Sequence, residues 1–166
     1  VQLPFWKAPP RSESKSFDLI LSAVEHPSIM EPARRVQEAG YRLGLIEPET
    51  DYSFSPGKLA TLVSSDTKLV SMMLANNETG HVYPISDLAA AARAANPAIW
   101  IHCDAVQALG KLPMSFEALG VDMLSLSGHK IGALSGTGAL VVSDRIDCEP
   151  LICGGPQETR WRAGTE

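Results

Sequence analysis

Short apolar runs alternate with amphipathic stretches along this chain from residue 18 onward. Mainly apolar runs of four to eight residues favour buried strands, and the longer amphipathic stretches favour helices. Regular alternation of the two predicts an α/β fold, a mainly parallel sheet with flanking helices. Strands are predicted at residues 18–24, 41–47, 68–75, 98–104, 122–127 and 137–143, and helices at residues 27–40, 55–65 and 85–96.

The two ends of the chain differ from this pattern. Residues 1–17 are rich in Pro and Ser and carry charges of both signs, which predicts a surface loop or irregular segment. Residues 18–166 are long enough for one domain with a sizeable core. The chain starts without Met and stops at "RWRAGTE" without a terminating signal, so we expect it to be a piece of a longer protein.

Composition and net charge argue against several classes of binding partner. The formal net charge is −5 and Lys and Arg form no run, which argues against binding to nucleic acid or to an anionic membrane surface. No apolar run approaches the roughly 20 residues of a membrane-spanning helix, and no signal peptide is evident, so we predict a cytoplasmic protein. Three cysteines without CxxC spacing indicate neither a disulfide framework nor a zinc site.

Polar clusters follow four of the predicted strands: "EHPS", "NNETG", "CDAVQ" and "SGHK". The carboxyl ends of parallel strands share one edge of a sheet, where ligands commonly bind. Taken singly, Asp104 is explained as a cap, His26 and Lys130 as surface residues, and Asn77 as a turn residue. Together, a lysine and a carboxylate at neighbouring strand ends match the needs of pyridoxal 5′-phosphate (PLP).

Several segments also resemble a known family. "EHPSI", "VSMMLANNETG", "HCDAVQALGK", "LSGHKIG" and "PQETRWRAGTE" have the order and spacing seen in NifS-type cysteine desulfurases and selenocysteine lyases, of the class V aminotransferase superfamily. The resemblance runs from about residue 20 to the end of the chain. It implies the large cofactor domain of a fold-type I PLP enzyme.

The resemblance implies catalytic roles for three residues. Lys130 would form the Schiff base with PLP, Asp104 would pair with the pyridinium nitrogen, and His26 would stack on the ring and is a candidate for proton transfer. A free lysine amine, with a pKa of ~10.4, is protonated at neutral pH. We therefore expect the strand end to bury Lys130 partly, so that its amine can act as nucleophile and base.

Five further residues match cofactor ligands of the family. Asn77 and Gln107 would lie near the phenolic oxygen of PLP, and Ser127 and His129 would bind its phosphate. Thr165 would reach the phosphate in the neighbouring subunit, which implies a homodimer with shared sites.

Some features of the family are absent from this chain. No threonine-containing phosphate turn precedes "EHPS", no C-terminal domain with the sulfur-accepting cysteine follows, and none of Cys103, Cys148 and Cys153 falls in the acceptor position. The loop from Gly132 to Gly138 also lacks the proline that many members have. The resemblance thus implies an incomplete PLP domain of an enzyme that converts L-cysteine to alanine and a persulfide. The resemblance implies that such an enzyme passes sulfur to an acceptor protein and supplies sulfur for iron-sulfur cluster assembly.

The sequence leaves several alternative functions open. The enzyme could instead be a selenocysteine lyase or another class V aminotransferase-type enzyme, and the chain by itself could be an inactive scaffold. A metal-dependent hydrolase is a further alternative, because His102, Asp104 and His129 are metal-ligand types and alternate residues of a strand share a face. That alternative leaves Lys130 and "NNETG" unexplained.

Overall fold

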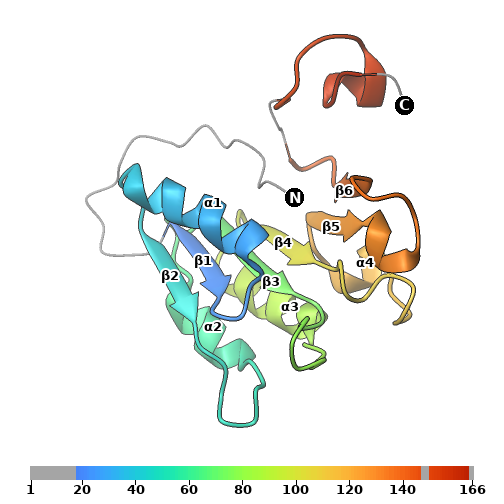
Figure 1. The fold of residues 1–166 in the computed structure, drawn as a ribbon. Coiled ribbons are helices and arrows are strands. Elements are labelled where there is room, and N and C mark those ends of the chain that lie inside the picture. The colour runs from blue at the N-terminus through green and yellow to red at the C-terminus, as the bar shows by residue number, and fades with distance from the viewer. Residues whose placement is uncertain (1–17, 147–149, 165–166) are drawn as a thin grey trace.

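A computed structural model describes residues 18–146 and 150–164. These residues form a six-stranded sheet with helices on both faces (Figure 1). The strands are β1 (Leu19–Ser22), β2 (Leu43–Ile46), β3 (Leu69–Met73), β4 (Trp100–Asp104), β5 (Met123–Ser127) and β6 (Gly138–Val142). Their order across the sheet is β2-β1-β3-β4-β5-β6. The first five strands are parallel and β6 runs antiparallel to β5, so the prediction of a mainly parallel α/β sheet is confirmed.

Four α-helices connect these strands: α1 (Pro27–Glu38), α2 (Pro56–Leu62), α3 (Ile85–Ala95) and α4 (Phe116–Leu119). Two short 3₁₀ helices, η1 (Gly128–Ile131) and η2 (Gln157–Arg160), follow β5 and β6. The three predicted helices are confirmed, with ends that differ by a few residues. The sequence pattern did not indicate α4, η1 or η2, because four residues are too few to establish a helical period.

The two faces of the sheet carry separate hydrophobic clusters. Leu19 and Leu21 of β1 pack against Ile29 and Ala33 of α1. Strand residues whose side chains point to the other face form a larger cluster with α2 and α3. This cluster includes Ile20, Val70, Ile101 and Leu124 of the strands, Leu59 of α2 and Leu88 of α3. Burial on both faces explains why the parallel strands read as nearly continuous apolar runs.

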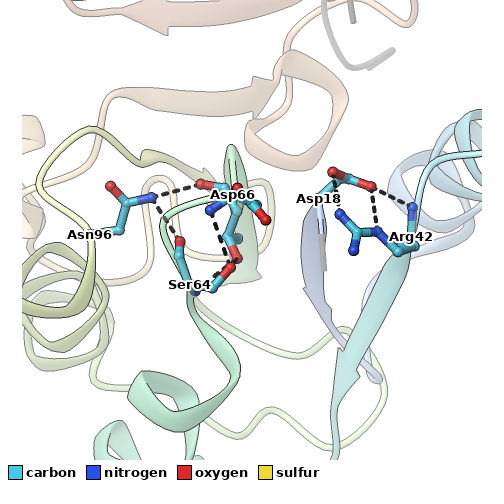
Figure 2. Close-up of polar contacts among 6 residues, drawn as sticks. Asp18, Arg42, Ser64, Asp66 and Asn96 are labelled. Atoms are coloured by element: carbon cyan, nitrogen blue, oxygen red, sulfur yellow. Dashed lines mark hydrogen bonds and ion pairs between the residues drawn. The ribbon is translucent and has the colours of Figure 1, made fainter. Parts of the chain in front are cut away.

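The amino ends of the strands are joined by polar contacts (Figure 2). Asp18, just before β1, accepts hydrogen bonds from the backbone N–H of Arg42 (2.8 Å) and from its guanidinium (3.1 and 3.2 Å). Asn96, before β4, donates through Nδ2 to the carbonyl oxygens of Ser64 (3.0 Å) and Thr67 (2.9 Å). These contacts tie together the loops that enter β1, β2, β3 and β4. This amino edge therefore has a structural role.

Asp122 anchors the same edge in front of β5. Its side chain is 2% exposed and makes ion pairs with Arg93 (2.9 Å) and Arg145 (3.2 Å). It also accepts the backbone N–H of Ile101 at 2.9 Å.

No helix within residues 18–146 and 150–164 is long and apolar enough to span a membrane.

Candidate active site at the carboxyl edge of the sheet

The carboxyl ends of β1, β3, β4 and β5 lie along one edge of the sheet, as the sequence pattern predicted. Asp104 is the last residue of β4 and Ser127 the last residue of β5. His26 begins the helix that follows β1, and Asn77 lies four residues beyond the end of β3. The parallel register aligns Asp104 with Met73 on one side and with Ser125 on the other. The fold thus gathers residues far apart in the sequence.

Asp104 is buried at the end of its strand, with 6% of its surface exposed. Its Oδ1 accepts the backbone N–H of Val106 at 2.9 Å, so the residue also has the capping role that its type suggested. Burial raises the pKa of the Asp104 carboxyl, while the Val106 N–H and the charge of His26 act in the opposite direction. A cation placed beside this acid would favour its ionised form.

His26 is exposed and caps the amino end of α1. Its Nδ1 accepts the backbone N–H of Ser28 at 3.1 Å and lies 2.9 Å from the Ser28 hydroxyl. These contacts fix one edge of the imidazole ring. His26 is also close enough to Asp104 for its charge to favour the ionised form of that carboxyl.

Two neighbouring asparagines have different environments. Asn76 is buried, and its Oδ1 accepts the backbone N–H groups of Glu78 and Thr79, both at 2.9 Å. Asn76 therefore builds the turn after β3. Asn77 is exposed beside it, so its amide is available for a ligand.

Gln107 lies in the turn after β4 and is half-buried. Its Oε1 accepts a hydrogen bond from Lys111 Nζ at 2.9 Å. That contact uses the oxygen of the amide and orients the side chain. The Nε2 group, the donor that the family resemblance assigns to PLP, takes no part in it.

The turn after β5 brings two donors together. Ser127 Oγ lies 2.8 Å from His129 Nδ1. A Cβ on Gly128, between them, would collide with the hydroxyl of Thr137 and crowd the Cβ of Ala133, so this arrangement of the loop favours glycine. A hydroxyl and an imidazole at one point suit a phosphate group.

The loop that departs from the family pattern is closed by its own backbone. The N–H of Gly128 donates to the carbonyl of Thr137, and the N–H of Ala133 donates to the carbonyl of Gly128, each at 3.0 Å. Gly132 and Gly136 adopt φ of 82° and 90°, which glycine allows without strain. The loop thus forms without the proline.

Lys130 lies on η1 and is exposed. The expectation that the strand end buries this lysine is therefore wrong for the chain by itself. The reason is that β5 ends at Ser127, and η1 then carries the chain beyond the edge of the sheet to the surface. Thr165, together with residues 1–17, lies outside the described residues.

The arrangement around His102 argues against the metal-dependent hydrolase. His102 is buried on β4, and its Nδ1 and Nε2 lie 2.8 Å from the hydroxyls of Ser71 and Ser125. Both ring nitrogens are occupied by neighbouring strands, while His129 lies exposed on η1. Within the described ranges, no group of three or more His, Cys, Asp or Glu side chains is arranged to hold a metal ion.

Comparison with known proteins identifies the family. The family model described as "Aminotransferase class-V" matches residues 11–163. The chain belongs to the class-V aminotransferase family. Curated relatives include a cysteine desulfurase of Enterobacter agglomerans, 40% identical over 90% of this chain and 37% of the relative. Another is a cysteine desulfurase IscS of Anaeromyxobacter dehalogenans, 37% identical over 92% of this chain and 38% of the relative.

Solved structures similar to this class-V chain agree with the fold. A NifS-like protein matches with a TM-score of 0.87 and 34% identity, over 93% of this chain and 42% of that protein. The structure of SspA in complex with cysteine matches with a TM-score of 0.84 and 33% identity, over 92% of this chain and 44% of that protein. The resemblance to NifS-type enzymes is therefore confirmed. The chain spans about two fifths of the length of the proteins it matches.

The donor set of this class-V chain fits PLP. Asp104 offers a buried carboxyl for a pyridinium, and Ser127 and His129 offer adjacent donors for a phosphate. Lys130, the one primary amine on η1, is exposed and thus accessible to an aldehyde.

One residue of this edge was missed by sequence reasoning. Glu25 lies directly before His26 and is buried. The "EH" pair reads as an ordinary polar strand end, so no sequence signal distinguishes a buried glutamate from an exposed one. Only the packing of the turn after β1 shows that the Glu25 carboxyl is withdrawn from water.

Proposed function

We propose that this chain is the PLP-binding part of a cysteine desulfurase, which removes sulfur from L-cysteine and leaves alanine. One observation carries the proposal: a lysine and a buried acid at the ends of adjacent strands, on the carboxyl edge of a class-V fold. The names of the curated relatives support the choice of reaction. The cysteine in the SspA complex supports the choice of substrate.

Each residue of the edge has a physical task in this proposal. Bound PLP would supply an aldehyde and an electron-withdrawing ring that stabilises negative charge at the substrate Cα. Lys130 Nζ would hold the cofactor at its aldehyde carbon and would serve as the base for the proton at the substrate Cα. Asp104 would keep the pyridinium nitrogen protonated, and His26 would lie against the ring.

The remaining ligands would orient PLP. Ser127 and His129 would donate to its phosphate, and Asn77 and Gln107 would donate near its phenolic oxygen. These four residues come from three different loops of the same edge. A cofactor held from several loops cannot rotate freely, which keeps the reacting carbon near Lys130.

Assembly is also part of the proposal. Ile131 and Leu134, next to Lys130, are 51% and 81% exposed, and a second copy of the chain would cover them and limit the access of water. Thr165 would then reach the phosphate of the neighbouring site. Transfer of sulfur to an acceptor protein, supply of iron-sulfur clusters and a cytoplasmic location remain predictions.

A cofactor titration tests the proposal directly. PLP added to the purified chain should produce a visible absorption band that Lys130→Ala abolishes and Lys68→Ala retains. Lys68 is a matched control, because it lies at the amino edge before β3. Absence of the band with the wild-type chain and with a longer protein that contains it would favour the scaffold alternative.

The reaction is tested with a longer protein that contains this sequence. With cysteine and a reductant it should release alanine and sulfide in equal amounts, whereas formation of a keto acid would favour an aminotransferase. A strong preference for selenocysteine would indicate the lyase. Asp104→Asn should abolish turnover while preserving the fold, because the amide oxygen can still accept the Val106 N–H.

A further inference from the structure

Glu25 occupies an unusual position in the turn between β1 and α1. Its side chain is 8% exposed, and its Oε1 accepts the hydroxyl of Ser22 at 2.7 Å. Its Oε2 is buried and has no hydrogen-bond partner among the described residues. An ionised carboxylate with a bare buried oxygen carries a large desolvation cost, whereas a neutral carboxylic acid carries much less.

The turn holds this carboxyl in place. The backbone N–H of Glu25 donates to the carbonyl of Ser22 at 3.3 Å. Asn76, from the loop after β3, donates through Nδ2 to the carbonyl of Val24 at 3.4 Å. The next residue, His26, is fixed as the cap of α1. Turning Glu25 out into water would therefore disturb contacts on both sides of the turn.

Several titratable groups surround the Glu25 carboxyl. Burial raises its pKa to about 7, the Ser22 hydroxyl and the backbone N–H of Met73 oppose this, and the negative charge of Asp104 adds to the increase. Burial also raises the pKa of the Cys103 thiol, and the charges of Glu25 and Asp104 both contribute. The pKa of the Tyr83 hydroxyl is raised by burial and by the charge of Glu25. Met73, whose backbone N–H faces Glu25, is also the register partner of Asp104 on the adjacent strand β4. Glu25 and Asp104 therefore lie at the same buried corner of the site, and His26 is the nearby group that favours the Asp104 anion.

Two carboxyl groups in one poorly solvated corner do not both ionise easily, because each anion raises the cost of the other. Asp104 has a backbone N–H at 2.9 Å from its Oδ1 and the charge of His26 nearby. Glu25 Oε2 has no hydrogen-bond partner among the described residues, and the Met73 N–H offsets only a small part of the effect of burial. Asp104 is therefore the better site for a negative charge. Glu25 is the better site for the proton.

We propose that Glu25 and Asp104 form a carboxyl pair that holds a single negative charge up to about neutral pH, with the charge on Asp104 and a proton on Glu25 Oε2. Glu25 is then a positioning residue, since it keeps the single charge on the acid that would face the pyridinium. This role rests on the proposed function. When a cation pairs with Asp104, the O–H bond at Oε2 breaks in part of the molecules, the electron pair stays on the oxygen, and the proton passes to solvent.

A titration without cofactor tests the pair. Carboxyl ¹³C resonances of the wild-type chain are followed between pH 3 and pH 9, and Glu25→Gln identifies the Glu25 signal. The midpoint should lie near 7 in the wild type and fall by roughly one unit in Asp104→Asn. The exposed Asp87 of α3 gives a matched control, because Asp87→Asn should leave the midpoint unchanged. A wild-type midpoint near 4.5, or no change in Asp104→Asn, overturns the pair.

A second measurement separates this inference from the proposed function. Calorimetric binding of PLP at pH 7, in two buffers of different ionisation enthalpy, reports the protons released by the wild type and by Glu25→Gln. The wild type should release more protons than the variant, and equal release overturns the pair. If PLP does not bind to the wild type, the proposed function fails, while the carboxyl titration still decides on the pair.

Discussion

The two edges of the sheet use similar polar residues in opposite ways. At the amino edge, Asp18, Asn96 and Asp122 are engaged by Arg side chains, backbone N–H groups or carbonyl oxygens. At the carboxyl edge, the side chains of Asn77 and Lys130 are exposed. Pairing within the fold marks a structural group, and a polar group left accessible on a shared edge marks a candidate for ligand binding.

The difference has a thermodynamic meaning. A buried polar group contributes to stability only when its hydrogen bonds are made, so mutations at the amino edge should act on folding. Exposed groups that bind a ligand contribute little to the free energy of unfolding, so mutations there should act mainly on function. Each substitution below tests whether the two edges divide in this way.

The largest effect is expected at Lys130. In a longer protein that contains this sequence, Lys130→Ala should lower the rate of alanine release at least about 10³-fold, which corresponds to about 4 kcal/mol. Its free energy of unfolding should change by less than about 0.5 kcal/mol, because the side chain is exposed. Turnover assays and denaturant unfolding measure the two effects. A strongly destabilised variant would show that Lys130 belongs with the structural residues.

The largest effect on folding is expected at Asp122. Asp122→Ala should lower the free energy of unfolding by about 3 kcal/mol, because it removes the buried carboxylate that pairs with Arg93 and Arg145 and leaves the N–H of Ile101 without its acceptor. Urea unfolding followed by circular dichroism measures this change. Glu117→Ala is a control at an exposed acid on α4 and should cost much less. Equal effects would contradict a structural amino edge.

Glu25 should show a pH-dependent effect. Its pKa rises from 4.5 when unfolded to about 7 when folded, so its contribution to stability is present below pH 4.5 and is lost as the pH rises through 7. Relative to Glu25→Gln, the wild type should lose on the order of 3 kcal/mol between pH 4 and pH 8. Unfolding curves of both proteins across this range check the sign. A constant difference would mean that Glu25 does not hold a proton in the fold.

Two asparagines give the smallest and most closely matched test. Asn96→Ala should cost about 1 to 2 kcal/mol, because the carbonyls of Ser64 and Thr67 lose their donor. Asn77→Ala should cost less than about 0.5 kcal/mol but weaken PLP binding. Parallel urea unfolding and cofactor titration compare the two. If the Asn77 variant proved the less stable one, exposure would be a poor guide to function at this edge.

Much of the fold was predictable because it depends on the local spacing of apolar and polar residues. The apolar runs predicted all six strands of the sheet, and the intervening stretches predicted α1, α2 and α3. The clusters after the strands predicted the edge on which His26, Asn77, Asp104, Gln107, Ser127, His129 and Lys130 lie. Their roles toward PLP, and that of Thr165, stay predictions that the experiments above address.

The rest depended on contacts between distant residues. Residue type could not distinguish Asn76, which builds a turn, from Asn77, which is exposed beside it. It also could not show that Lys130 lies at the surface, because that depends on where η1 leaves the sheet.

By itself, then, the sequence determined the α/β class, the order of its elements and the edge that carries the chemistry, since apolar period and strand-end polarity are local properties. Only the tertiary structure decided which polar groups are paired and which are buried without a partner. Glu25 is the clearest case, because its neighbours Ser22 and Asp104 come from two different strands. Burial and the interaction between charges depend on how distant segments pack together, which the order of residues along the chain does not show directly.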